Sequence, residues 1–193
     1  NLEIARVEGL AAGSVYPSDL VNYTPANATE RKTLTSWHAD FRLPTLVTEA
    51  QREISFNYDS YGNVTLLGIR DTAANATRTW NTSYVYHPTV PGVITQRIED
   101  GPRTDVADIT TINYYAPDEN CTGDHMGCRG QIASITNALG HVTYITRYNA
   151  HGQPEVVIDP NGVNTTLVYD ARQRLISRAV GTETTDYQYD GVG

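Results

Sequence analysis

The sequence predicts an all-β protein in which β-hairpins repeat along the chain and form a curved or spiral antiparallel sheet. Three observations lead to this prediction: abundant Tyr, Thr and Val, a tyrosine-centred phrase that recurs, and turn sequences between short apolar runs. β-Branched and aromatic side chains fit a pleated, half-buried surface. The 15 Gly and 9 Pro of the chain are scattered between the apolar runs and supply turns.

Charge and hydropathy exclude two classes of partner. The 193 residues carry a formal net charge of −8 with a sequence pI near 5.0, whereas a nucleic-acid-binding surface needs positive charge. We therefore expect no nucleic-acid partner. No apolar run approaches the roughly 20 residues of a membrane-spanning helix. We expect no membrane span in this segment.

The recurring phrase is an apolar residue, any residue, Tyr, and then Asp, Asn or His. Around one copy, Ile54, Phe56 and Tyr58 alternate with Ser55 and Asn57, which is the periodicity of a strand. The phrase also occurs, in stronger or weaker form, at residues 84–87, 112–115, 146–149, 167–170 and 187–190. The tyrosines and following polar residues that we assign to the repeat are Tyr58 with Asp59, Tyr86, Tyr148 with Asn149, Tyr169 with Asp170, and Tyr189 with Asp190.

Two kinds of turn follow from the sequence. After the Tyr-Asp phrase, the Asp or Asn can hydrogen-bond the backbone two residues on, and a Gly accepts positive φ, so the chain reverses. These glycines are Gly62, Gly130 and Gly152, and Gln173 stands at the equivalent place without a Gly. Turns between hairpins end at Gly140 and Gly162; in the second, Asp159 opens the turn and Pro160 is pre-set for its second position.

These signals predict about six hairpins in residues 35–193. We expect them near 35–50, 54–70, 82–100, 110–137, 143–159 and 165–180, with a seventh begun at 185–190. Residues 1–34 fit no unit and are expected to be irregular or a partial repeat. An isolated hairpin is only marginally stable, so neighbouring hairpins must stack. Both ends of the sequence are expected to continue into a longer protein.

The phrases Tyr-Asp-x-x-Gly, at 58–62, and Asp-Pro-x-Gly-x-x-Thr, at 159–165, resemble those of RHS (YD) repeats. The resemblance implies strands wound in a spiral sheet that forms a hollow β-shell. In bacterial RHS proteins such a shell encloses a C-terminal toxic domain, and in teneurin-like animal proteins a related shell mediates adhesion at the cell surface. The resemblance therefore implies an extracellular or surface location. It also implies that the partners are other repeats, copies of the chain or an enclosed toxin-like domain.

Cys121 and Cys128 are the two cysteines, with six residues of a Gly-containing loop between them. This spacing allows a disulfide, which we expect and which would place the protein in an oxidising compartment. Free thiols are one alternative. The other is a metal site that adds Asp124 and His125, but the spacing matches no common zinc pattern, so we predict no metal.

No catalytic residue and no cofactor are predicted. The five histidines are dispersed, and the chain lacks a Gly-x-Ser-x-Gly elbow, a His-Glu-x-x-His helix and a P-loop. RHS proteins often self-cleave beside an Asp-Pro-x-Gly motif, but repeat sequence continues after residues 159–162, so a turn is expected there. The predicted function is structural. The alternative is an adhesive or self-assembling, filament-forming module, with carbohydrate binding by the tyrosines as a further option.

Overall fold

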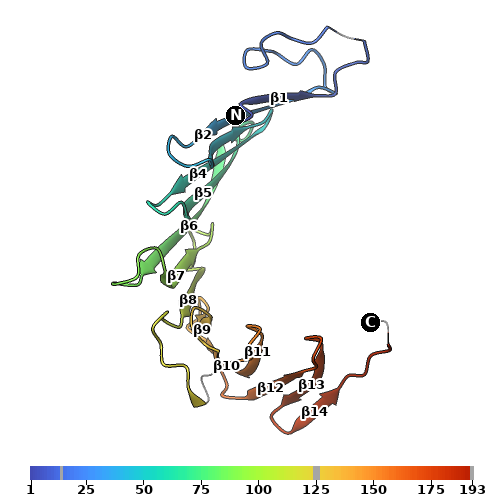
Figure 1. Ribbon diagram of the computed structural model, residues 1–193. Helices are drawn as coiled ribbons and strands as arrows, with labels where there is room; N and C mark the ends of the chain where they lie inside the picture. The colour runs from blue at the N-terminus through green and yellow to red at the C-terminus, as the bar shows by residue number, and fades with distance from the viewer. Residues whose placement is uncertain (14, 124–126, 192–193) are drawn as a thin grey trace. The chain divides into compact units, whose positions relative to one another are not determined.

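The computed structural model describes residues 1–13, 15–123 and 127–191, and in this part of the chain it confirms the all-β prediction. Fourteen strands form one open antiparallel sheet, and their hydrogen-bonded order follows their order in the chain (Figure 1). The strands are β1 (Ala5–Glu8), β2 (Arg31–Trp37), β3 (Pro44–Thr48), β4 (Arg52–Tyr58), β5 (Val64–Asp71), β6 (Ala76–Tyr86), β7 (Ile94–Asp100), β8 (Ile109–Tyr114), β9 (Ile132–Thr136), β10 (Val142–Tyr148), β11 (Pro154–Ile158), β12 (Asn164–Tyr169), β13 (Leu175–Val180) and β14 (Glu183–Asp186).

The chain divides into two compact units. One comprises residues 1–82 with 101–106, and the other comprises residues 83–100 with 107–193. The division falls within β6, so that strand contributes to both units. The separate boundary that the sequence predicts after residue 34 stays a prediction.

In the first unit, apolar side chains form rows across one face of the sheet. Ile54 pairs with Ile69, and Phe56 pairs with Leu67, so both pairs project from the same face of β4 and β5. Such cross-strand pairs each contribute about 0.2–1 kcal/mol. Both rows extend to a neighbouring strand. One row consists of Val47, Ile54 and Ile69, and the other consists of Phe56, Leu67 and Trp80.

In the second unit, the two faces of β8 and β9 differ in chemistry. Ile112 is 7% exposed and pairs with Ile135 on one face. On the other face the Gln96 side-chain amide donates to Asn113 Oδ1 over 2.8 Å, and Asn113 Nδ2 donates to Ser134 Oγ over 3.0 Å. This ladder gives the buried Ser134 a hydrogen-bond partner, as buried polar groups require.

Five turns share one hydrogen-bond pattern. In each, the Oδ1 of the first residue accepts the backbone N–H groups two and four residues later, over 2.8–3.0 Å. The residue three positions on donates its N–H to the carbonyl of the first residue and has a positive φ. The five turns run from Asp59 to Gly62, Asn137 to Gly140, Asn149 to Gly152, Asp159 to Gly162 and Asp170 to Gln173.

Gln173 shows that the hydrogen bonds, rather than the glycine, define this turn. Its φ is 67°, in the left-handed region where Gly62, Gly152 and Gly162 have φ values of 83°, 78° and 80°. For a residue with a Cβ, this conformation is less stable by roughly 1–2 kcal/mol. The four hydrogen bonds around Asp170 are formed nonetheless.

We expect Gly162→Ala to lower the free energy of unfolding by about 1–2 kcal/mol, because a Cβ at φ +80° is strained. No atom lies within 4 Å of the added Cβ, so the lost stability reflects backbone strain and not a steric clash. Gly162→Asn is the matched control and should lose less, since Asn tolerates this region. Urea unfolding measures both. Equal midpoints for the wild type and the Ala variant would contradict the expectation.

Candidate functional site

Three tyrosines at strand ends, and Tyr189 three residues after β14, have hydroxyls that donate to the strand before their own. In each case the acceptor is the carbonyl oxygen of the first residue of that strand, and the distances run from 2.6 to 3.0 Å. A tyrosine therefore ties the end of one strand to the beginning of the strand before it. The four pairs are Tyr58 with Pro44, Tyr148 with Ile132, Tyr169 with Pro154, and Tyr189 with Leu175.

A register shift accompanies the aromatic residue at the end of these strands. The pairing of β4 with β5 shifts between Asn57 and Tyr58, and that of β12 with β13 shifts between Val168 and Tyr169. Such bulges re-aim a side chain relative to the regular alternation of a strand. The tyrosine can then reach the strand on the other side of its own. Equivalent shifts occur before Trp37, Tyr114 and Tyr148.

Trp37 makes the same connection, and the sequence analysis missed it. Its Nε1 donates to the carbonyl oxygen of Glu3, two residues before β1, over 2.8 Å. The next residue, His38, takes the place of Asp or Asn, because its Nδ1 accepts the N–H groups of Asp40 and Phe41. The signal was present in the sequence: an aromatic residue followed by His, as at residues 86–87, where His87 Nδ1 accepts the N–H of Val90.

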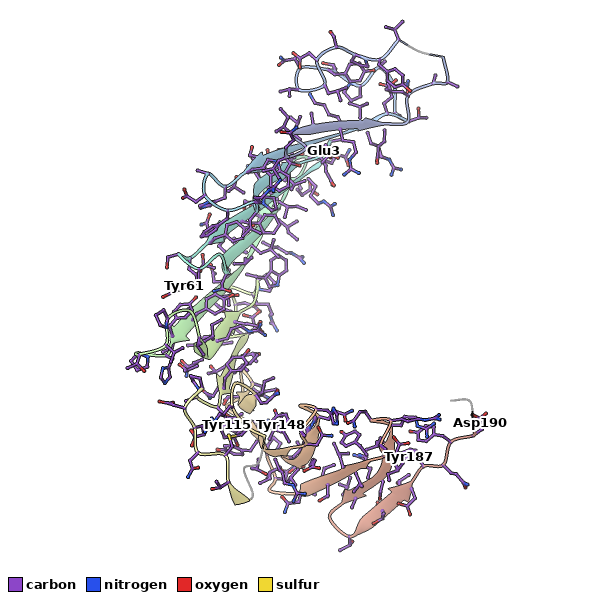
Figure 2. The ribbon with its side chains drawn as sticks, viewed as in Figure 1. Glu3, Tyr61, Tyr115, Tyr148, Tyr187 and Asp190 are labelled. Atoms are coloured by element: carbon purple, nitrogen blue, oxygen red, sulfur yellow. A yellow bond between two sulfur atoms is a disulfide. The ribbon has the colours of Figure 1, made fainter. Side chains whose placement is uncertain are left out.

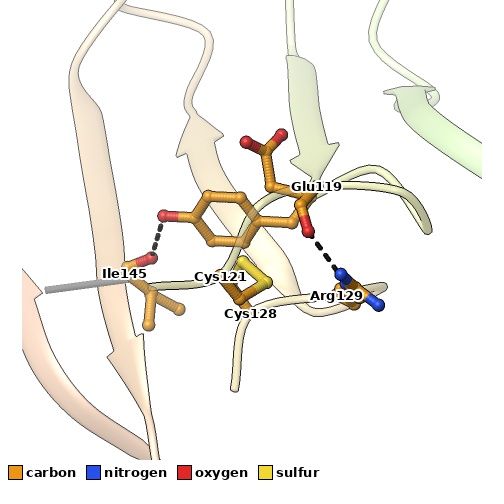
Figure 3. The surroundings of a disulfide bond; sticks show 6 residues. Glu119, Cys121, Cys128, Arg129 and Ile145 are labelled. Carbon is orange, nitrogen blue, oxygen red and sulfur yellow. Dashed lines mark hydrogen bonds between the residues drawn. A yellow bond between two sulfur atoms is a disulfide. The ribbon is translucent and has the colours of Figure 1, made fainter. Parts of the chain in front are cut away.

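Cys121 and Cys128 form a disulfide with a Cα–Cα distance of 5.6 Å, as expected. It closes the loop between β8 and β9, and Cys128 is fully buried (Figure 3). The Arg129 Nε donates to the Glu119 carbonyl oxygen over 2.8 Å, which holds the two sides of the loop together. From the start of this loop, Tyr115 donates its hydroxyl to the Ile145 carbonyl oxygen over 3.0 Å.

The alternative metal site would lack its sulfur ligands, because the sulfur atoms of Cys121 and Cys128 are bonded to each other. Asp124 and His125 lie outside the described residues. Among the residues that are described, no three His, Cys, Asp or Glu side chains are grouped as metal ligands. Asp118, in the same loop, instead contacts His87, with 3.1 Å between Oδ1 and Nε2.

Burial raises the pKa of three of the tyrosine hydroxyls. Tyr148 is 5% exposed, and burial, followed by the charge of nearby Tyr115, raises its pKa to about 12 (Figure 2). Burial also raises the pKa of Tyr58 and of Tyr169. A tyrosine with its ordinary pKa near 10 is already protonated at neutral pH, so the raised pKa extends hydrogen-bond donation by these side chains to more alkaline pH.

The remaining predicted site residues also lie at strand ends and turns. Gly130 has a φ of 71° and donates its N–H to the Tyr115 carbonyl oxygen over 3.0 Å. Tyr86 ends β6, and its ring centroid is 6.3 Å from that of Tyr84. Pro160 is exposed in the second position of its turn, and Asp190 is exposed directly after Tyr189.

A hollow of about 360 Å³ lies beside the turns that follow β10 and β12. Its lining includes Arg147, Glu155 and Asp170. Arg147 Nε lies 2.6 Å from Glu155 Oε2, and Asp170 Oδ2 lies 2.8 Å from Arg174 Nη2. The N–H of Arg174 holds the pKa of the Asp170 carboxyl below its usual value. These charged side chains form ion pairs and the hydrogen bonds of the turn, so their role is structural.

We expect Tyr148→Phe to lower the free energy of unfolding by about 1 kcal/mol, because it removes the hydrogen bond to the Ile132 carbonyl. Tyr189→Phe is the matched control; its ring is 41% exposed, so water can replace the lost bond and the effect should be smaller. Urea unfolding followed by circular dichroism measures both. A larger loss for Tyr189→Phe would contradict this account.

The same tyrosine predicts a dependence on alkaline pH. Because the folded pKa of Tyr148 is raised from 10.0 to about 12, its contribution to stability is complete below pH 10 and is lost as the pH rises through 12. Absorbance at 295 nm should show a late-ionising tyrosine that is missing in Tyr148→Phe. Titration of all tyrosines in one step near pH 10 would contradict it.

Loss of the disulfide should lower the free energy of unfolding by about 2–3 kcal/mol, because the short closed loop no longer restricts the unfolded chain. The double variant Cys121→Ser with Cys128→Ser tests this by urea unfolding. Wild-type protein in reducing agent is the control, since it loses the bond without placing a hydroxyl at the buried position of Cys128. Unchanged midpoints in both samples would contradict the expectation.

No helix in the described residues has the length and apolar character needed to cross a membrane. Comparison of the sequence with protein-family models and with curated proteins finds no match in either. The interpretation of the site therefore depends on the contacts of its own residues.

Proposed function

We propose that the chain is a structural segment of a secreted or surface-displayed RHS (YD)-repeat β-shell, which encloses or presents another domain, such as a toxin. The observation that carries this proposal is the recurrence of one set of contacts along the chain. An aromatic side chain at or just after a strand end donates to a carbonyl at or just before the start of the preceding strand, at Trp37, Tyr58, Tyr148, Tyr169 and Tyr189. Recurring contacts of this kind are what a stacked repeat needs.

The use of polar side chains supports a structural role. Asp59, Asn149 and Asp170 each direct one oxygen to two backbone N–H groups of their own turn. Between neighbouring turns, Asn149 donates to the side-chain oxygen of Gln173, and Gln153 donates to the carbonyl oxygen of Gln173. The side chains that the sequence repeats are thus employed in turns and in contacts between turns.

One further observation supports the proposed secreted or surface location, and another supports the alternative function. A disulfide is typical of proteins in an oxidising compartment, which fits a secreted or surface protein. The alternative, an adhesive or self-assembling module, is favoured by the exposure of all four residues of β14 at the edge of the sheet. Exposed Tyr61, Tyr144 and Tyr187 would be the candidates for carbohydrate binding.

The parent protein tests the proposal directly. Antibodies against this chain should recover, from extracellular or surface fractions of the source cells, a polypeptide much longer than 193 residues. Mass spectrometry should find in it further Tyr-Asp hairpins and a domain without them. Recovery of a chain of this length from a reducing compartment, with Cys121 and Cys128 as free thiols, would overturn the proposal.

Protease sensitivity then separates enclosure from adhesion. The non-repeat domain should be cut more slowly within the parent protein than when it is produced alone, because a surrounding shell restricts access. The control is a protease-sensitive tag at the end of the parent, which should be cut in both samples. Equal rates for the domain in both samples would favour presentation or adhesion over enclosure.

A further inference from the structure

The turn between β2 and β3, residues 38–43, is closed by a histidine where other turns use Asp or Asn. The His38 N–H donates to the Leu43 carbonyl oxygen over 2.9 Å, which closes the turn. Its Nδ1 accepts the backbone N–H groups of Asp40 over 3.1 Å and of Phe41 over 3.2 Å. The ring of His38 therefore supplies the acceptor for two backbone donors at the start of this turn.

An imidazole can take this role because its Nδ1 occupies the position of a carboxylate oxygen. Nδ1 of His and Oδ1 of Asp are each bonded to Cγ, so both acceptors have the same reach along the side chain. Asp71 shows the equivalent contact, since its Oδ1 accepts the N–H groups two and three residues on, those of Ala73 and Ala74, each over 2.9 Å. His38 and Asp71 thus make the same two contacts with different chemical groups.

The two chemical groups differ in what a proton does to them. A neutral imidazole has one acceptor nitrogen, whereas a protonated imidazole has two N–H donors and no acceptor. Because Nδ1 of His38 is the acceptor, the ring carries its hydrogen on Nε2 in the closed turn. A second proton, on Nδ1, would face the N–H groups of Asp40 and Phe41, so the ring must turn away from them. Histidine takes up this proton between about pH 7 and 5.

The same ring joins this turn to the turn between β4 and β5. The ring centroids of His38 and Phe41 lie 4.7 Å apart, and those of His38 and Tyr58 lie 6.0 Å apart in an edge-to-face arrangement. Phe41 and Leu43 also lie against the second turn, where a Cβ on Gly62 would be 3.8 and 3.6 Å from their respective Cδ1 atoms. Movement of the His38 ring therefore disturbs the packing of one turn against the other.

We propose that residues 38–43 form a pH-sensitive turn: the neutral ring of His38 holds it closed against the turn of residues 59–63, and the protonated ring releases it. The closed turn binds only the neutral ring. The contribution of His38 to stability is therefore present above the titration range of histidine and is lost as the pH falls through that range. Turns closed by Asp or Asn keep their acceptor over the same range, because carboxylates ordinarily stay charged there and amides do not titrate.

The charged groups around the His38 ring do not hold it in place once it is protonated. None of the ion pairs formed by the described residues includes His38, whereas Nε2 of His87 lies 3.1 Å from Asp118 Oδ1, which would hold that ring. Tyr58 is uncharged in this pH range, because tyrosine has an ordinary pKa near 10 and burial raises the pKa of Tyr58 further. The remaining charged side chains of the adjoining segments are exposed or have other partners: Asp40 and Arg42 are exposed in the turn, Glu3 pairs with Arg6, and Asp59 accepts the N–H groups of Tyr61 and Asn63.

Hydrogen exchange measured by NMR on the whole chain tests the proposal. Between about pH 7.5 and 5.5, and after correction for the intrinsic effect of pH, the protection of the Asp40 and Phe41 N–H groups should fall roughly tenfold, as expected when their hydrogen bonds are lost. The N–H groups of Tyr61 and Asn63 donate to Asp59 and should keep their protection, so they are the internal control.

His38→Asn and His38→Asp are the matched variants, because each keeps an acceptor on Cγ that does not ordinarily take up a proton in this range. In both variants the protection of the Asp40 and Phe41 N–H groups should be the same at the two pH values. Nuclear Overhauser effects between the Phe41 ring and Gly62 should weaken at the lower pH in the wild type alone. The urea midpoint should likewise fall more in the wild type than in His38→Asn, since the other four histidines are present in both chains.

Protection of the Asp40 and Phe41 N–H groups that is independent of pH in the wild type, or that falls equally in His38→Asn, would overturn the proposal. Equal losses at Tyr61 and Asn63 would also overturn it, because they would show general unfolding and not the opening of one turn. NMR of the imidazole nitrogens needs no substitution: at about pH 7.5, Nδ1 of His38 should be the nitrogen without a hydrogen, and the opposite tautomer would contradict the closed turn. These results concern one turn, whereas the recovered parent protein decides the proposed function, so the two can fail separately.

Discussion

The sheet depends on a recurring hydrogen bond from an aromatic side chain, at or just after a strand end, to a carbonyl at or just before the start of the preceding strand. Large buried side chains are few: in the described residues the buried apolar side chains are Ile112, Cys128 and Tyr148. A sheet with so little core cannot fix its register by packing alone. The donors at Trp37 and Tyr58 act across strand pairs in the first unit, and those at Tyr148, Tyr169 and Tyr189 act in the second.

Much of the strand pattern could be predicted because the turn residues carry their own hydrogen-bond acceptors. Strands β4 and β5 pair over residues 52–71, and β10 and β11 pair over 144–158, close to the hairpins expected at 54–70 and 143–159. A side chain such as Asp59 or Asn149 makes its contacts within four residues, so a local pattern reveals it. The role of these residues as members of a repeat remains a proposal.

The parts that sequence reasoning missed depend on contacts between distant residues or on an unusual substitution. The bond of Trp37 to Glu3 spans 34 residues, and its donor is a tryptophan, whereas the recurring phrase contains a tyrosine. Gln173 was assigned to a glycine position from the sequence, but its positive φ depends on the hydrogen bonds around Asp170 that hold its backbone there. The disulfide was predictable from spacing, but the burial of Cys128 depends on how the loop packs, which spacing does not specify.

The short reach of these contacts has a consequence for how such a chain can change in evolution. Each turn is completed by its own residues, and the hydroxyls of Tyr58, Tyr148, Tyr169 and Tyr189 each donate to the strand before their own. A strand pair can therefore be duplicated or lost while the others keep all of their bonds, because stability in such an array is nearly a sum over neighbours. The loop closed by Cys121 and Cys128 shows a related freedom, since 17 residues separate the strand-end Tyr114 from β9, whereas five separate Tyr58, Tyr148 and Tyr169 from the strands that follow them. Array length and loop length can thus vary independently of the fold.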